Sequence, residues 1–136
     1  MGLRATARAV PGTLRQTVLI DDRYRLITDQ PEHVGGDGAG PSPHELFPGA
    51  LAACTVWALV SYARAKDWDL GEVTVEIDYD HRSTPRRIET TIRLTGELSP
   101  SQSARLHKVA AACPLRRSIE SGITFAEQIE LVPKAA

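Results

Sequence analysis

The chain passes from a loop rich in glycine and proline into its longest apolar segment within residues 40–55. These residues read Gly40-Pro41-Ser42-Pro43-His44-Glu45-Leu46-Phe47-Pro48-Gly49-Ala50-Leu51-Ala52-Ala53-Cys54-Thr55. Ser42, the proline after it and Glu45 three residues later have the spacing of a capping box at a helix N-terminus. The apolar residues continue to Val60 on almost every side, which indicates a helix buried on all sides. We expect this central helix to end near Lys66 and to be kinked or interrupted near Pro48.

The residues before this helix predict strands and a loop. Residues 15–20 and 24–28 read as two strands joined by a turn-like Asp-Asp-Arg cluster, and residues 4–10 predict a further strand. Residues 29–43 are rich in glycine and proline. What precedes them is too short to be a domain, and no Gly-Lys-Ser/Thr ending follows. We therefore expect an ordered surface loop rather than a linker or a phosphate-binding loop.

The residues after the helix predict a hairpin, a second helix and a last strand. Residues 73–79 and 88–94 alternate apolar and polar side chains with a period of two, which is typical of strands. Ser99 begins a second capping box, and Pro114 breaks or restarts the helix that follows. Residues 123–132 predict a final strand. The pattern as a whole orders strands, a buried helix, a hairpin, a second helix and a last strand along the chain.

Composition sets the class of protein. The chain has 136 residues, 42 % hydrophobic and 24 % charged, which predicts one globular domain spanning residues 1–136. The net charge is −1 and no basic stripe stands out, so we expect no nucleic-acid partner. No secretory signal is apparent at the N-terminus, and the apolar segment at residues 50–60 is too short for a membrane span. We expect a cytoplasmic protein that does not bind membranes.

The two cysteines, Cys54 and Cys113, both fall on apolar faces of expected helices and both follow alanines. Free cysteine often packs as a small buried hydrophobe, so each can be purely structural. Small neighbours also leave room for a second sulfur or for a substrate. A thiolate that attacks a peroxide becomes a sulfenic acid, which a second thiol converts into a disulfide. If the helix restarts at Pro48, its amides lower the pKa of Cys54.

A thiolate in apolar surroundings needs a cation nearby. Arg15, Arg23 and Arg25 on the first strands are the candidates. Glu45 is the carboxylate nearest Cys54 in sequence and could orient such an arginine, although it is equally well explained as a capping residue. Four aromatic side chains either line a pocket or belong to the core: Tyr24, Phe47, Trp57 and Tyr62.

Two other classes of site lack their sequence signals. The cysteines and the four histidines, His33, His44, His81 and His107, contain no C-x₂₋₄-C or H-x₃₋₅-H pair, so we expect no metal. The G-x-S-x-G motif of α/β-hydrolases is absent as well.

Two motifs resemble those of the OsmC/Ohr family. One comprises Gly35-Gly36, residues 40–47 and residues 50–55, and the other is residues 111–119 around the second cysteine. The resemblance implies an α+β fold with antiparallel sheets around a buried central helix, assembled as an intertwined homodimer with its sites at the interface. It also implies reduction of organic hydroperoxides, as in oxidative stress responses, without a metal or flavin cofactor and with electrons from a dithiol or lipoyl-bearing reductant. By motif match, Cys54 is the peroxidatic thiol and Cys113 the resolving thiol.

The match departs from the Ohr branch at the catalytic glutamate, which lies there ten residues before the first cysteine. In this chain His44 occupies that position and Glu45 lies nine before Cys54, as in the broad OsmC-like branch. Arg15 best matches the early arginine of the family. These features predict a cysteine-based organic hydroperoxide reductase with Cys54, Cys113, Glu45 and Arg15 in its site and a depressed Cys54 pKa. The alternatives are a redox-sensing or apolar-ligand-binding protein on the same fold, and a structural dimer with inert cysteines.

Overall fold

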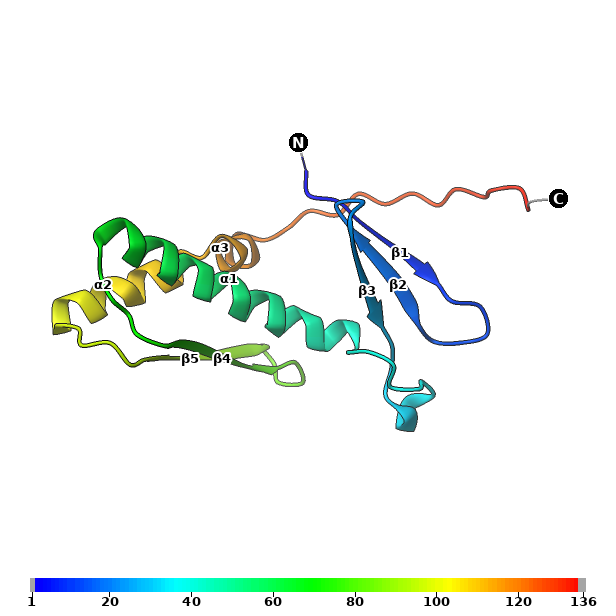
Figure 1. Ribbon diagram of the computed structural model, residues 1–136. Helices are drawn as coiled ribbons and strands as arrows, with labels where there is room; N and C mark the ends of the chain where they lie inside the picture. The colour runs from blue at the N-terminus through cyan, green and yellow to red at the C-terminus, as the bar shows by residue number, and fades with distance from the viewer. Residues whose placement is uncertain (1, 135–136) are drawn as a thin grey trace.

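The computed structural model describes residues 2–134 and shows an α+β chain (Figure 1). It contains two antiparallel sheets, β1-β2-β3 and β4-β5, and three α-helices. In chain order the elements are β1 (Ala5–Ala9), β2 (Gln16–Ile20), β3 (Tyr24–Thr28), the 3-10 turn η1 (Glu32–Val34), α1 (Pro43–Lys66), β4 (Val73–Asp80), β5 (Arg87–Leu94), α2 (Pro100–Ala111) and α3 (Pro114–Ser121).

Helix α1 begins as the sequence predicts. The Ser42 hydroxyl accepts a hydrogen bond from the backbone of Glu45, and the Glu45 carboxylate accepts one from the backbone of Ser42. The expected interruption at Pro48 is wrong, because the helix runs unbroken from residue 43 to residue 66. Proline removes only one backbone donor here, and the capping box has already fixed the turn before it.

The expectation that the central helix is buried on all sides is also wrong within one chain. Its buried residues, Leu51, Thr55, Leu59 and Ala63, recur every four positions and so form a single face. This face packs against β4, α2 and α3. On the opposite face the Trp57 side chain is 59 % exposed.

The length of α1 also corrects the argument against a membrane span. The helix has 24 residues and a window of mean hydropathy 1.6, so by length and composition it could cross a bilayer. However, α1 packs along the β4-β5 hairpin and against α2 (Figure 1). Its place is therefore that of the core helix of this fold.

The β4-β5 hairpin confirms the predicted alternation. Val75 pairs with Ile92 and Tyr79 with Ile88, and the half-buried residues of β4 alternate with exposed ones. The sheet lies against α1, and the two helices α1 and α2 form the centre of the core. Its buried members are Leu59, Ala63, Leu70, Leu106 and Ala110.

The N-terminal sheet stands apart from this core. Figure 1 places β1-β2-β3 beyond the N-terminal end of α1, and within residues 2–134 none of the buried core residues comes from it. The predicted strand at residues 123–132 is wrong for the single chain: residues 123–134 are exposed and follow an extended path, but they pair with no strand (Figure 1). An extended segment gains ladder hydrogen bonds only when a neighbouring strand supplies the partners.

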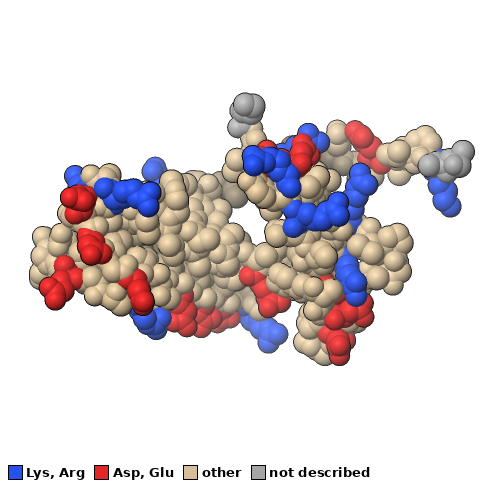
Figure 2. Space-filling model, in the orientation of Figure 1, with Lys and Arg blue, Asp and Glu red and all other residues tan. Residues whose placement is uncertain are grey.

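Charges of both signs are mixed over the face drawn in Figure 2. Basic and acidic residues both occur on that face, and several basic residues gather over the N-terminal sheet. The middle of the molecule, where α1 lies, shows a broad area without charged residues (Figures 1 and 2). That uncharged area coincides with the helix whose second face is uncovered.

Leu59 is fully buried at the centre of the core, and its truncation tests where the core lies. We expect Leu59→Ala to lower the free energy of unfolding by about 2–5 kcal/mol, because it leaves a cavity between α1 and its neighbours. The matched control is Leu3→Ala, at a fully exposed leucine, with an expected change below about 0.5 kcal/mol. Urea unfolding followed by circular dichroism measures both, and equal losses would contradict the assignment of the core.

Candidate active site

The structure brings the two cysteines together from opposite parts of the sequence. The Sγ atom of Cys113 lies 2.8 Å from the Sγ atom of Cys54, within hydrogen-bonding distance, and both are free thiols. Cys54 sits in the middle of α1 and is partly exposed, whereas Cys113 is fully buried. A substrate can therefore approach Cys54 more easily than Cys113.

Cys113 owes its position to the junction of two helices. Helix α2 ends at Ala111 and α3 begins at Pro114, so Cys113 is the residue before the first turn of α3. Its backbone N–H still bonds the Ala110 carbonyl, which keeps it against the end of α2. The small side chains before it allow this junction to approach α1 closely.

The α3 junction favours a negative charge on Cys113. Burial opposes that charge, but the hydrogen bond with Cys54 and the backbone amides of Arg116 and Leu115 together lower the pKa of Cys113. These amides belong to the first turn of α3 and have no partner within the helix. The Thr55 side chain acts in the same direction.

The predicted depression of the Cys54 pKa is wrong for the single chain. Burial raises the pKa of Cys54, and the hydrogen bond with Cys113 raises it further. The prediction relied on a helix start near Pro48. The helix begins at Pro43 instead, so Cys54 lies about three turns inside it, where the amides are already paired. Within the described residues, no arginine or lysine contributes to the Cys54 pKa.

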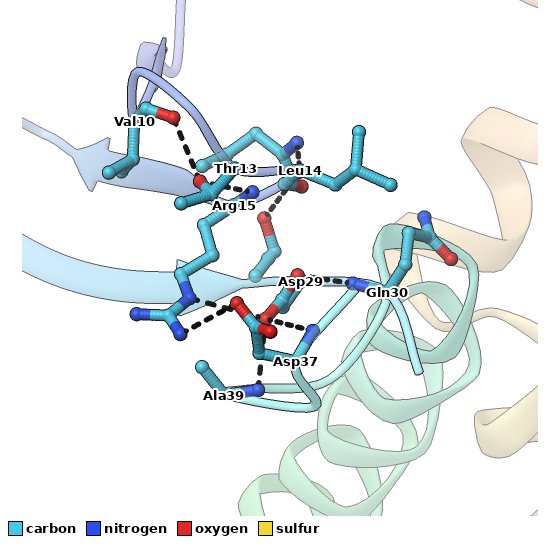
Figure 3. A network of polar contacts seen from close by, with 10 residues as sticks. Val10, Thr13, Leu14, Arg15, Asp29, Gln30, Asp37 and Ala39 are labelled. Atoms are coloured by element: carbon cyan, nitrogen blue, oxygen red, sulfur yellow. Dashed lines mark hydrogen bonds and ion pairs between the residues drawn. The ribbon is translucent and has the colours of Figure 1, made fainter. Parts of the chain in front are cut away.

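Arg15 lies in the N-terminal sheet region, away from this thiol pair. Its Nε donates to Asp29 at 3.3 Å and its Nη2 to Asp37 at 3.0 Å (Figure 3). The sheet lies beyond the start of α1, whereas the thiols lie further along the helix beside α3 (Figure 1). The rivals Arg23 and Arg25 are exposed at the β2-β3 turn and on β3. One chain therefore does not bring any of these arginines to its own cysteines.

Glu45 and His44 are also occupied elsewhere. Hydrogen bonds with Ser42 lower the pKa of Glu45, and the bond to the Ser42 backbone has a larger effect than the bond to its hydroxyl. This carboxylate is therefore an ionised capping group. The His44 ring packs at a tilt against His81 of the hairpin, with centroids 5.2 Å apart. Sequence reasoning identified the capping role of Glu45 but gave no signal for the His44–His81 contact, which depends on tertiary packing.

A cavity of about 690 Å³ has Thr55, the neighbour of Cys54 in sequence, in its lining, although neither cysteine lines it. It lies between α1, β5, α2 and α3, and its lining includes Leu51, Thr55, Ile88 and Arg116. Thr55 connects the cavity to Cys113, because its side chain contributes to the Cys113 pKa. Of the aromatic candidates, Phe47 lines this cavity, Trp57 and Tyr62 line a shallower groove on the other side of α1, and Tyr24 is exposed on β3.

Among residues 2–134, no group of three or more His, Cys, Asp and Glu side chains could hold a metal ion. The chemistry that the described site offers on its own residues is that of two thiols in contact. The hydrogen bond with Cys54 and the amides at the start of α3 lower the pKa of Cys113, whereas Cys54 is the more accessible of the two.

Comparison with known proteins gives the family. The profile of the OsmC-like protein family matches residues 35–128 of the 136, and this span includes both cysteines. The chain belongs to the OsmC-like family. This family includes organic hydroperoxide resistance proteins. None of the curated proteins matches the sequence significantly.

Solved structures share the fold. An OsmC-like protein from Mycoplasma pneumoniae is 18 % identical, with 88 % of each chain covered and a TM-score of 0.73. A protein from Psychrobacter arcticus 273-4 is 24 % identical, with 86 % of this chain and 88 % of that chain covered and a TM-score of 0.71. An organic hydroperoxide resistance protein from Legionella pneumophila is 23 % identical, with coverages of 88 % and 89 % and a TM-score of 0.63. These similarities establish the α+β architecture of this OsmC-like protein.

The contact between the two sulfurs predicts easy disulfide formation. Treatment of the reduced protein with diamide should give an intramolecular Cys54–Cys113 disulfide, because the two Sγ atoms already touch. Peptide mapping without reductant measures the linkage, and Cys54→Ser and Cys113→Ser serve as controls that cannot form it. Thiols that stay reduced, or that link only between molecules, would contradict the observed contact.

Proposed function

We propose that this OsmC-like protein is a thiol-dependent peroxidase that reduces organic hydroperoxides, with Cys54 as the peroxidatic and Cys113 as the resolving thiol. The observation that carries the proposal is the 2.8 Å contact between the two sulfurs, which lie on the two family motifs. Structural cysteines need no such contact. An oxidised Cys54 would find its resolving partner without any large movement of the chain.

The first step is attack of the Cys54 thiolate on the outer oxygen of the hydroperoxide. A sulfur–oxygen bond forms while the oxygen–oxygen bond breaks, and two electrons pass from sulfur to the peroxide. The leaving alkoxide takes up a proton and becomes the alcohol. The protein product is a Cys54 sulfenic acid.

The second step regenerates the site. The Cys113 sulfur attacks the sulfur of the sulfenic acid, a disulfide forms, and the hydroxyl leaves as water with the Cys113 proton. A dithiol, such as a lipoyl group, then reduces the disulfide by thiol–disulfide exchange and is itself oxidised to a cyclic disulfide. A reducing cytoplasm is the compartment that suits this cycle.

Cys54 is assigned the first step because it is accessible, although the α3 amides favour charge on Cys113. Once one of the two thiols has lost its proton, the hydrogen bond between the sulfurs allows the remaining proton to reside on either of them. A cation beside Cys54 would shift the charge to that sulfur. We propose that Arg15 of a second copy supplies this cation, since Arg15 does not reach the thiols of its own chain.

A homodimer would also cover the apolar surfaces that one chain leaves exposed. Ile123, Phe125, Ile129 and Leu131 are 63–94 % exposed and alternate along the extended C-terminal segment. The uncovered face of α1 around Trp57 and the isolated N-terminal sheet also lack apolar partners in one chain. Exposed apolar surface of this extent is typical of an interface. A second copy of this chain could cover the C-terminal segment, the open face of α1 and the N-terminal sheet together.

The activity is tested by peroxide consumption. With tert-butyl hydroperoxide and dithiothreitol, we expect turnover by the wild type and none by Cys54→Ser, because serine supplies no thiolate. Cys113→Ser should accumulate a Cys54 sulfenic acid that dimedone traps, since its resolving thiol is missing. Peroxide loss is followed by ferrous xylenol orange, and the trapped adduct by mass spectrometry.

A wild type no faster than Cys54→Ser would refute the peroxidase. The raised Cys54 pKa of the single chain favours one alternative, a redox sensor that forms the disulfide without efficient turnover. Slow peroxide loss with complete disulfide formation would support that function. The cavity lined by Thr55 would then serve to bind an apolar ligand.

The dimer is tested on the C-terminal segment. We expect the double substitution Phe125→Asp and Ile129→Asp to weaken or abolish the dimer, because it places charges on the apolar face of the segment. The control is Thr124→Asp with Gln128→Asp, which changes the opposite face at the same spacing. Light scattering after size exclusion measures the mass. A wild type that is monomeric, or a dimer that both doubles leave intact, would contradict this interface.

A further inference from the structure

Asp29 is a fully buried carboxylate that directly follows β3. Its Oδ1 accepts a hydrogen bond from the Gln30 amide at 2.8 Å, and its Oδ2 accepts from the amides of Ala39 at 3.0 Å and Asp37 at 3.2 Å. The hydrogen bond from the Ala39 amide is the largest contribution and lowers the pKa of Asp29, although burial acts in the opposite direction. The side chain is therefore ionised, and it gathers the loop between β3 and α1 around itself.

The same Oδ2 atom accepts the Nε–H of Arg15, while the carboxylate of Asp37 accepts from Nη2. Two carboxylates thus accept hydrogen bonds from one edge of the guanidinium. Figure 3 shows its remaining nitrogen, Nη1, pointing away from both. Two N–H donors on that nitrogen stay available for another group.

The loop that presents these acids has little freedom to relax. A Cβ atom at Gly36 would overlap the Gln30 backbone, and one at Gly40 would overlap the Ile27 carbonyl oxygen. The loop therefore lies directly on the end of β3. Because Asp29 is buried and bonded to three amides of that loop, its carboxylate is a fixed anchor for Arg15.

The helix N-terminus supplies no competing anchor. The Glu45 carboxylate accepts a hydrogen bond from the Ser42 backbone, and the His44 ring packs at a tilt against His81. Neither side chain forms a hydrogen bond with Arg15, which forms ion pairs with Asp29 and Asp37 instead. The carboxylate that orients the arginine in this chain thus comes from the end of β3.

We propose that Asp29 is the positioning residue for Arg15, holding the guanidinium so that its Nη1 group faces the thiol pair of a second copy. The inference rests on the proposed peroxidase function. There a fixed N–H donor would stabilise the Cys54 thiolate and the negative charge that develops on the alkoxide oxygen. Asp29 touches neither substrate nor sulfur and acts only through Arg15.

The test compares Asp29→Asn with Arg15→Ala in single-turnover oxidation by tert-butyl hydroperoxide, well below the unfolding temperature. We expect each to slow the reaction about 10- to 100-fold, because a misplaced guanidinium loses its effect. The double variant should be no slower than Arg15→Ala, since the two residues act as one unit. The pH at which Cys54 becomes reactive to iodoacetamide should rise in Asp29→Asn and Arg15→Ala alike. The control Asp69→Asn changes an exposed aspartate that also bonds a loop amide but no arginine, and it should react like the wild type.

Asp29→Asn with a lowered melting temperature but an unchanged rate and alkylation profile would show a purely structural Asp29 and overturn the inference. If Asp29→Asn does not fold, the variant Arg15→Lys takes its place in the test. Lysine keeps the positive charge but cannot form the paired Nε and Nη2 hydrogen bonds to the two carboxylates. We expect Arg15→Lys to be as slow as Arg15→Ala, and a rate like that of the wild type would overturn the inference. Either failure leaves the peroxidase standing if the wild type turns over, whereas a wild type without turnover refutes the proposed function itself.

Discussion

Helix α1 buries one face in its own chain, and the arrangement of the molecule depends on that one-sided packing. Leu59 and Ala63 hold it against α2 and the β4-β5 hairpin. Packing in this register also places Cys54 beside the junction where α2 ends and α3 begins, so the two sulfurs meet. The opposite face carries an exposed Trp57 and remains available to another molecule.

The electrostatics of the thiol pair follow from where each sulfur lies on its helix. Cys113 precedes the first turn of α3, whose unpaired amides stabilise a negative charge. Cys54 lies inside α1, where backbone donors are already used, and burial raises its pKa. In one chain, therefore, the sulfur whose pKa is lowered and the accessible sulfur belong to different residues. A cation from outside the chain is the simplest way to move the charge to the accessible sulfur.

The Asp29 network shows how a buried charge can define a loop. A carboxylate without water is stable only when hydrogen bonds replace its hydration, and here three backbone amides and Arg15 do so. The same contacts fix the path from β3 to the start of α1 and restrain an arginine at the edge of the N-terminal sheet. A structural requirement of the loop and the orientation of Arg15 are thus met by one side chain.

The sequence by itself determined the local elements and the family. Both capping boxes, the alternation in the β4-β5 hairpin and the break at Pro114 depend on neighbours within a few residues, and the structure confirms them. The two cysteine motifs identified the family because their residues are contiguous. The carboxylate partners of Arg15 carried no such pattern, since Asp29 and Asp37 lie 14 and 22 residues away from it.

Only the tertiary structure decided the direction in which each thiol pKa is shifted and the exposure of each apolar face. The direction of the Cys54 pKa depends on where α1 starts and on which helix end faces which sulfur. Residues 123–132 have the alternation of a strand, yet strand formation requires a neighbour that one chain does not provide. Local patterns specify which structure a segment favours, whereas burial, pKa and pairing depend on groups that folding brings from far along the chain.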